Sequence, residues 1–572
     1  MGAVGHVARV SGPLVEVDGL GDIAMSELVE IGDLRLPGEI VAIHEEHTSV
    51  QAYEYTGGLS VGDRVVALGR PLSAHLGPEL LGGVFDGLLR PLAGAPTWLT
   101  PDAERSGLRR DWEWRPSVVK GADIREGGVL GIVPDVGSVE YRVLVPPGTG
   151  GEVEEIIGPG CYGPEQTLAV VAGTPVRVGT DWPVRQPRPV RERIAATEPL
   201  LTGQRVLDAV FPLARGGSAA VPGGFGTGKT VLLQQIAKWC AADVIVYVGC
   251  GERGNEMADV LAELAELTDP RTGRPLAERT VIIANTSNMP MMARETSIYT
   301  GVAVAEYFRD MGQHAVVIAD STSRWAEALR EFTSRSGALP AEEGYPATLA
   351  SELAAFYERA GRVITLGGGE GSVTIIGAVS PPGGDTTDPV TAHTERFVRE
   401  LWSLNRDLAY GRHYPAIAWS GSFSRDAEKL GAWYARNGDP EWAGRRARVT
   451  SLLSEADRLS DLAELVGASS LPGHERVTLL AGRLLREGVL QQSTLSANDA
   501  HCSAAKTATL IDSVLAAVDR CEALVDRGVT ASEIEEVDFS PLLRAAAETP
   551  PEGTREVALR RDQMLDVLAG LR

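Results

Sequence analysis

The N-terminal third of the chain consists of short runs in which hydrophobic and polar residues alternate, separated by turns that contain glycine. Residues 4–10, for example, read VGHVARV. Alternation with a period of two is typical of strands that bury one face. It predicts a small antiparallel N-terminal β-barrel over residues 1–69, a connection over 70–109 that leads to an insertion, and an inserted β-rich lobe over 110–188.

The pattern changes over residues 189–430, where nearly continuous apolar runs alternate with longer stretches of helical spacing. The runs are residues 218–221, 244–248, 281–284, 316–319 and 373–378. Strands without a polar face are typical of a parallel sheet that is covered on both faces. Beyond residue 430 such runs stop, and Leu, Ala, Glu and Arg recur at helical spacing. We expect a multidomain α/β protein with a parallel-sheet core over 189–430 and a C-terminal helical domain over 431–572.

Composition narrows the classes of function. The 572 residues include 77 acidic and 54 basic ones, a formal net charge of −23. A surface this acidic repels nucleic acid and anionic lipid, so we expect neither as a direct partner. We find no run of 18 apolar residues, and we expect a soluble, cytoplasmic chain. The five cysteines show no CxxC spacing, which disfavours zinc and disulfide frameworks, and we expect them to be reduced thiols in the core.

The strongest local signal is the segment 223–230, which reads GGFGTGKT and matches the pattern GxxxxGKT. It follows a predicted strand and precedes a predicted helix, as a phosphate-binding loop requires. Glycines let the backbone wrap a phosphate, Lys229 would bridge the β and γ oxygens, and the Thr230 hydroxyl would hold magnesium. A glycine-rich turn with an exposed lysine is the alternative, which the flanking strand and helix disfavour. The core is therefore predicted to be a P-loop NTPase (RecA-like) domain.

Hydrolysis of a bound nucleotide also needs carboxylates. Asp320 ends the apolar run 316–319, which places it at the carboxyl edge of the sheet, so we predict that it serves the magnesium ion. An Asp in this position could instead cap the following helix. Glu252 follows the run 244–248, and glycines on either side of Glu252–Arg253 leave its carboxylate free to polarise a water molecule. The alternative for Glu252 and Arg253 is a solvated ion pair in a loop.

At this point the residues resemble the catalytic A subunits of V-type and archaeal-type rotary ATPases. The resemblance covers most of the chain and rests on four segments besides the phosphate loop. They are GCGERGNEM at 249–257, NTSNMPMMARETSIYTGVAVAEYFRDMG at 285–312, ADSTSRWAEALRE at 319–331 and YPATLASELAAFYERAGRV at 345–363. The lobe at 110–188 resembles the extra segment that distinguishes these subunits from their relatives.

The resemblance implies a role for each motif residue. Glu252 would activate the lytic water, Arg253 would contact the phosphates of ATP or ADP or their neighbours, and Asp320 would lie in the magnesium shell, through a water molecule. Phe225 and Tyr414 would approach the adenine, although core packing is an equally good account of Tyr414. The residues expected to hold the nucleotide are Gly223, Gly224, Phe225, Gly226, Thr227, Gly228, Lys229, Thr230 and Tyr414.

The resemblance also implies partners. The chain would alternate with a non-catalytic B subunit in a hetero-hexamer, and the B subunit would supply an arginine in trans. Central-shaft and peripheral-stalk subunits would link the ring to a membrane sector, so the chain would be cytoplasmic and peripheral to a membrane. It would hydrolyse or synthesise ATP coupled to transport of protons or sodium ions.

Two other interpretations stay open at the level of sequence. A non-rotary hexameric motor, such as a secretion-system export ATPase or an RNA translocase, is disfavoured by the lobe at 110–188 and by the acidity, since RNA tracking needs a basic path. A ring subunit that binds nucleotide without catalysis is disfavoured by Glu252 together with the intact GKT.

Overall fold

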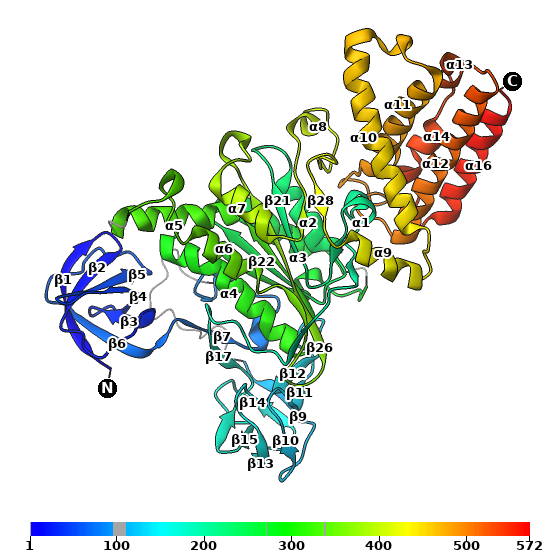
Figure 1. Ribbon diagram of the computed structural model, residues 1–572. Helices are drawn as coiled ribbons and strands as arrows, with labels where there is room; N and C mark the ends of the chain where they lie inside the picture. The colour runs from blue at the N-terminus through cyan, green and yellow to red at the C-terminus, as the bar shows by residue number, and fades with distance from the viewer. Residues whose placement is uncertain (1, 95–109, 270, 337–338, 572) are drawn as a thin grey trace. The chain divides into compact units, whose positions relative to one another are not determined.

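The computed structural model describes residues 2–94, 110–269, 271–336 and 339–571 (Figure 1). The chain separates into two compact units, and this division falls inside the predicted core at 189–430. The first unit contains Met1–Ala195, Ala242–Val379 and Thr387–Phe397, and the second contains Ala196–Ala241, Ser380–Thr386 and Val398–Arg572. Residues 95–109 of the predicted connection lie outside the described residues.

The N-terminal strands of the first unit form a closed barrel with the order β1-β2-β5-β4-β3-β6. The strands are β1 (Val4–Ser11), β2 (Leu14–Asp18), β3 (Glu27–Ile31), β4 (Leu36–Ile43), β5 (Thr48–Ala52) and β6 (Arg64–Pro71). Inward residues such as Val15, Val29 and Val50 are fully buried, because alternate positions of a strand point to opposite faces. The predicted barrel is confirmed.

The segment after the barrel carries strands of its own. β7 (Ser73–Leu76) pairs with β17 (Thr180–Pro183), and β8 (Val84–Phe85) adds a parallel strand to β23 (Thr280–Asn285) at the edge of the core sheet. The predicted connection therefore contributes to the sheet that it was expected only to precede.

The β-rich lobe consists of two four-stranded sheets, with the orders β10-β13-β15-β16 and β12-β11-β9-β14. The strands are β9 (Trp112–Pro116), β10 (Asp123–Ile124), β11 (Val129–Val133), β12 (Tyr141–Leu144), β13 (Gly151–Ile156), β14 (Gly160–Tyr162), β15 (Ala169–Val171) and β16 (Thr174–Val176). All five cysteines were expected in the core. This is wrong for Cys161 in this lobe, which is exposed, whereas the other four cysteines are buried.

A parallel sheet with the order β26-β24-β22-β23-β8 forms the core of the first unit. Its central strands are β22 (Val244–Cys250), β24 (His314–Asp320) and β26 (Glu370–Val379). β25 (Gly361–Ile364) is antiparallel to β26, and β18 (Glu192–Ile194) is antiparallel to β25. The helices of this unit are α3 (Gly254–Glu266), α4 (Met291–Asp310), α5 (Thr322–Ser336), α6 (Leu349–Tyr357) and α7 (Pro389–Phe397). All seven residues of β22 are buried, which accounts for its lack of a polar face.

The second unit combines a short sheet with the C-terminal helices (Figure 1). β21 (Ser218–Pro222) lies parallel to β27 (Glu400–Leu401), β28 (Phe423–Ser424) is antiparallel to β27, and β19 (Pro199–Leu200) pairs with β20 (Leu213–Ala214). The helices are α1 (Arg205–Val210), α2 (Lys229–Trp239), α8 (Arg406–Tyr410), α9 (Ala427–Arg436), α10 (Trp442–Val466), α11 (Gly473–Leu485), α12 (Ala504–Asp526), α13 (Ala531–Glu535), α14 (Ser540–Leu543), α15 (Ala545–Glu548) and α16 (Thr554–Ala569), with a π-helical turn, η7 (Arg486–Leu490), after α11. The predicted helical tail is confirmed.

Across the described parts of the chain, no helix combines the length and the hydrophobicity that a membrane crossing requires.

Candidate active site

The GxxxxGKT segment forms the turn between β21 and α2 in the second unit. β21 is buried throughout, and the backbone leaves it through two glycines with positive φ, Gly226 at 77° and Gly228 at 88°. A side chain is rarely tolerated in this left-handed region. A Cβ on Gly223 would lie only 2.7 Å from the Thr227 hydroxyl. The sequence pattern therefore reflects backbone geometry at these three glycines.

Lys229 and Thr227 brace this turn from within. The Lys229 ammonium donates to the carbonyl oxygens of Gly223 and Gly224, the latter at 3.2 Å, and the Thr227 hydroxyl donates to the Gly224 carbonyl at 2.8 Å. The lysine therefore arches over the loop and holds its positive charge at the mouth of the turn. Thr230 is half-buried in the first turn of α2.

These residues fit a polyphosphate. α2 has eleven residues and no acidic residue in its first turn, so the helix itself contributes no carboxylate that would oppose the positive potential of its N-terminal N–H groups and dipole. The Lys229 ammonium adds a full positive charge at the same place. The Thr230 hydroxyl supplies an oxygen of the kind that Mg²⁺ prefers.

Two aromatic side chains border the loop. Phe225 is 94% exposed and Tyr414 is 39% exposed, so neither is a core residue. The Tyr414 ring lies against the loop, because a Cβ on Gly228 would be 3.3 Å from its Cε1 atom. Glycine at 228 thus serves two purposes, the positive φ and the close approach of this ring.

Two carboxylates of the first unit lie at the carboxyl ends of the neighbouring strands β22 and β24. Gly249 on β22 is directly opposite Asp320 on β24, and Glu252 comes two residues after the end of β22. Asp320 is 2% exposed and accepts a hydrogen bond from the Tyr247 hydroxyl at 3.2 Å. The sequence separates these acids widely, and the parallel register brings them to one edge.

The electrostatics of this edge favour a protonated Glu252. Burial, the negative charge of Asp320, and a hydrogen bond and charge from Glu256 raise the pKa of Glu252 to about 8, and the positive charge of Arg324 opposes them. Like-charged carboxyl groups disfavour joint ionisation. A proton is therefore held at Glu252 near neutral pH, as expected for a group that exchanges protons.

The neighbours Glu256 and Arg324 are functional candidates that the sequence reasoning did not identify. A Cβ on Gly251 would lie 2.8 Å from the Arg324 Cβ, and the Arg324 guanidinium pairs with Glu327 at 2.9 Å. Glu256 follows Glu252 by four residues, as Arg324 follows Asp320, so each falls in the first turn of the next helix. This four-residue spacing from Glu252 and Asp320 is the sequence signal that could have identified them.

Arg253 is exposed immediately before α3, and the arginine that acts on the Glu252 pKa is Arg324. Cys250, at the end of β22, is buried, and burial raises the pKa of its thiol to about 12. It is therefore a packed core thiol, as expected, and no nucleophile. Lys229, Thr230 and Tyr414 belong to the second unit, and Glu252, Arg253 and Asp320 to the first. Their action at one site stays a prediction.

Four family models match successive parts of the chain. The ATP synthase alpha/beta family matches with its beta-barrel domain at residues 7–69 and its nucleotide-binding domain at 203–424. The alpha/beta subunit barrel-sandwich domain matches at 106–185, and the C-terminal domain of V and A type ATP synthase at 431–533.

Similar proteins cover nearly the whole chain. A V-type ATP synthase alpha chain from Anaeromyxobacter sp. (strain K) is 49% identical over 552 residues, which are 96% of this chain and 95% of that protein. The A-type ATP synthase A subunit of Methanopyrus kandleri is 45% identical over 565 residues, with 96% and 95% covered. Among solved structures, the assembled ATPase EscN of the enteropathogenic E. coli type III secretion system aligns with a TM-score of 0.66 and 22% identity, covering 90% of this chain and 100% of that one. This last likeness concerns the fold alone.

Proposed function

Since this chain belongs to the family of V-type ATP synthase alpha chains and A-type ATP synthase A subunits, we propose that Lys229, Glu252 and Asp320 act together on one bound ATP. The family's activity is ATP hydrolysis or synthesis by a rotary ATPase coupled to ion transport. The observation that carries the site assignment is the GxxxxGKT turn between the buried strand β21 and the acid-free N-terminus of α2. We also propose that the barrel, the connection, the inserted lobe and the nucleotide-binding domain end at residues 69, 109, 188 and 430, respectively.

The phosphates take their place in the loop of the second unit. Backbone N–H groups from Gly223 to Thr230 surround the β-phosphate, and the Lys229 ammonium leaves the loop carbonyls to bridge the β and γ oxygens. A carbonyl–ammonium contact is readily exchanged for a contact with a phosphate, which is ionised and binds more strongly. Magnesium, when bound, would neutralise charge that develops on the phosphates. Thr230 would hold it directly and Asp320 through water.

Glu252 orients and activates the attacking water molecule. In its ionised form it accepts a hydrogen bond from the attacking water and orients it toward the γ-phosphorus. Arg253, exposed beside it, contacts the phosphates or their neighbours. The pKa of Glu252 near 8 places the proton exchange within the physiological range.

Phe225 and Tyr414 approach the adenine. Exposed aromatic rings beside the phosphate loop offer flat apolar faces for the base. Stacking does not distinguish strongly between bases, so this contact contributes affinity and position rather than strict choice of nucleotide.

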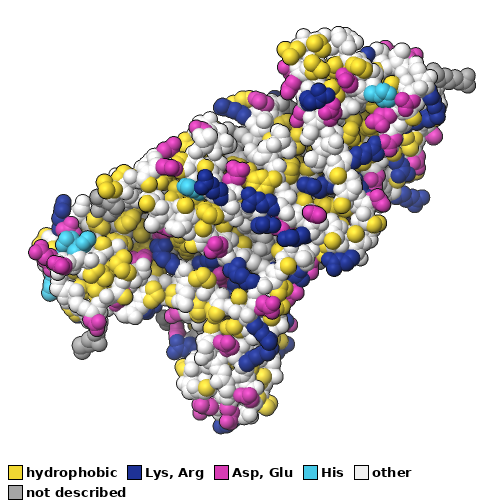
Figure 2. All heavy atoms as spheres, in the orientation of Figure 1, with side chains coloured by type: hydrophobic (Ala, Val, Ile, Leu, Met, Phe, Trp, Pro, Cys, Tyr) yellow, Lys and Arg dark blue, Asp and Glu magenta, His cyan; other side chains and the backbone are white. Residues whose placement is uncertain are grey.

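The chain works with other subunits of its complex. We propose an alternating hetero-hexamer with non-catalytic B subunits, each of which supplies a charge-stabilising arginine in trans. Shaft and stalk subunits connect this ring to a membrane sector, which places the chain at the cytoplasmic face of a membrane. Acidic and basic side chains are interspersed over the face that Figure 2 shows, and with a net charge of −23 the chain is poorly suited to follow nucleic acid.

The test is Glu252→Gln in the reconstituted complex. Glutamine keeps the size of the side chain and cannot take a proton, so ATP binding should be retained while turnover falls by at least about a hundredfold. Glu266→Gln, at the exposed end of α3, is the matched control and should leave turnover unchanged. Near wild-type turnover in Glu252→Gln would remove Glu252 from the mechanism.

A further inference from the structure

We propose that Gln492 is a positioning residue that fixes the Tyr414 ring against the phosphate loop. The proposal rests on the function proposed above, in which Tyr414 contacts the base, and it assigns the orientation of that ring to a segment of the C-terminal region.

The link between the two residues is direct. The backbone N–H of Gln492 donates to the carbonyl of Tyr414 at 2.7 Å. The Tyr414 ring in turn lies 3.3 Å from the position that a Cβ on Gly228 would occupy. A residue of the C-terminal region is therefore one hydrogen bond away from the aromatic residue that borders the phosphate loop.

The side chain of Gln492 explains why this backbone N–H is held in place. It is 2% exposed, and both ends of its amide are used. The Oε1 atom accepts from the backbone N–H of Arg205 at 2.9 Å, and the Nε2 atom donates to the carbonyl of Gly203 at 2.9 Å. An amide carries an acceptor and a donor on one planar group, so glutamine pairs with both backbone groups at once.

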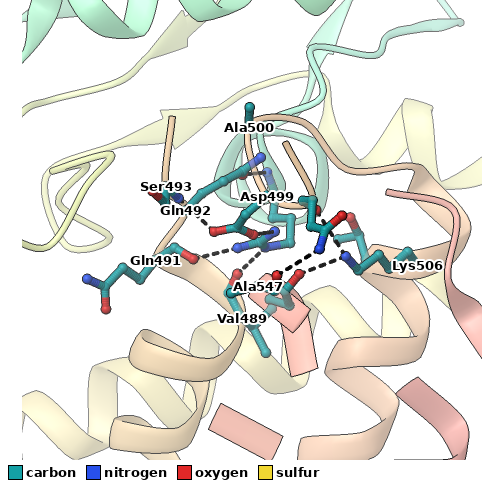
Figure 3. Close-up of polar contacts among 12 residues, drawn as sticks. Val489, Gln491, Gln492, Ser493, Asp499, Ala500, Lys506 and Ala547 are labelled. Atoms are coloured by element: carbon teal, nitrogen blue, oxygen red, sulfur yellow. Dashed lines mark hydrogen bonds and ion pairs between the residues drawn. The ribbon is translucent and has the colours of Figure 1, made fainter. Parts of the chain in front are cut away.

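Arg205 anchors the same segment through residues that Figure 3 labels, namely Val489, Gln491 and Asp499. Its guanidinium is fully buried and donates to the carbonyls of Val489 and Gln491, and it pairs with Asp499 at 2.6 Å. The second carboxylate oxygen of Asp499 accepts from the backbone N–H of Ser493 at 2.7 Å. The backbone on either side of Gln492 is therefore fastened to buried charged groups.

The loop that carries Tyr414 has a second attachment to the helices. The Trp419 indole N–H donates to Asp457 on α10, and Asp457 also pairs with Arg486 of η7 at 2.6 Å. The Arg486 guanidinium lies over the Trp419 ring. The loop is therefore held at Tyr414 by Gln492 and at Trp419 by Asp457, so the C-terminal region fixes the backbone that carries the Tyr414 ring.

Positioning through Tyr414 predicts a base-specific effect, which a general loss of structure would not give. We would measure binding of MgATP and of magnesium tripolyphosphate, which lacks the base, to the full chain in its assembled complex. The variants are Gln492→Ala, Tyr414→Ala and the double variant. Gln563→Ala, at an exposed position of α16, is the matched control.

We expect Gln492→Ala and Tyr414→Ala each to weaken MgATP binding by about tenfold. The double variant should be no more than about twofold weaker than Tyr414→Ala, because two residues that act through one contact are not additive. Tripolyphosphate binding should stay within about twofold in every variant, and in steady-state assays KM for ATP should rise while kcat is maintained. Gln563→Ala should resemble the wild type.

Additive losses in the double variant, or an equal loss of tripolyphosphate binding, would overturn the inference and make Gln492 a structural residue only. If Tyr414→Ala does not weaken ATP binding, the base contact of the proposed function fails as well, so the two failures are distinguishable. If Gln492→Ala does not fold, Gln492→Glu replaces it in the same cycle. It keeps the acceptor for Arg205 and loses the donor to Gly203, and an additive loss with Tyr414→Ala would again overturn the inference.

Discussion

Removing the negative charge of Glu256 should make the enzyme faster near neutral pH. A catalytic base must be ionised, and the pKa of Glu252 is raised to about 8, partly by the charge of Glu256 and its hydrogen bond. Glutamine at position 256 carries no charge and can donate to the Glu252 carboxylate. The variant Glu256→Gln should therefore lower the pKa of Glu252.

The pKa sets the size of the effect. With a value of about 8, about a tenth of Glu252 is ionised at pH 7 and about nine tenths at pH 9. The kcat/KM of the wild type should accordingly rise by about tenfold over this interval, because kcat/KM reports ionisation in the free enzyme. Glu256→Gln can gain at most about tenfold at pH 7 and should converge on the wild type at pH 9. Asp320 still raises the pKa in the variant, so we expect a gain below this ceiling.

The assay is kcat/KM for MgATP against pH in the assembled complex. Glu266→Gln removes a charge from the exposed end of the same helix and should leave the profile unchanged. Loss of an acidic residue in the first turn of α3 costs about 0.3–1 kcal/mol of stability, which cannot increase activity. A profile that is unchanged in Glu256→Gln, or that moves to higher pH, would refute the assignment of Glu252 as the base.

Two further substitutions test the second unit. Gly228→Ala forces a side chain into φ of 88° and against the Tyr414 ring, so we expect about 1–2 kcal/mol of destabilisation and weaker ATP binding, measured by urea unfolding and calorimetry; unchanged affinity would show that the turn tolerates a Cβ. Arg205→Met leaves Asp499 buried without its partner and should cost about 3–5 kcal/mol in urea unfolding, whereas Arg458→Met, on the exposed surface, should have no measurable effect. Equal effects of these two arginine substitutions would contradict the role given to burial.

The fold was predictable wherever the hydrophobic pattern is local. Alternation with glycine turns predicted the barrel, and runs without a polar face predicted the parallel core strands such as β22. β8 was not predicted, because a strand of two residues has no periodicity to detect. Its place is decided by β23, which lies far along the sequence. Short edge strands of this kind are determined by tertiary pairing rather than by their own residues.

The candidate site, too, was predictable only in its local part. The phosphate loop is contiguous, and its glycines are required by backbone angles that the motif itself encodes. The ionisation of Glu252 is different, because it depends on Asp320 from another strand and on Arg324 from the helix beyond. Sequence reasoning could name the two acids as candidates. It could not show that they share one edge closely enough for Asp320 to raise the pKa of Glu252.

The contacts of Gln492 and Arg205 could not be predicted from the sequence. Glutamine and arginine are usually surface residues, and neither stands in a pattern that indicates burial. Their structural role is to form hydrogen bonds with backbone N–H and carbonyl groups of residues 203, 205, 489 and 491. A buried backbone group without a partner costs about 1–3 kcal/mol, so loss of either side chain should destabilise this region. Because Gln492 also holds Tyr414, a substitution there should affect stability and nucleotide binding together, and only the base-free tripolyphosphate ligand separates the two effects.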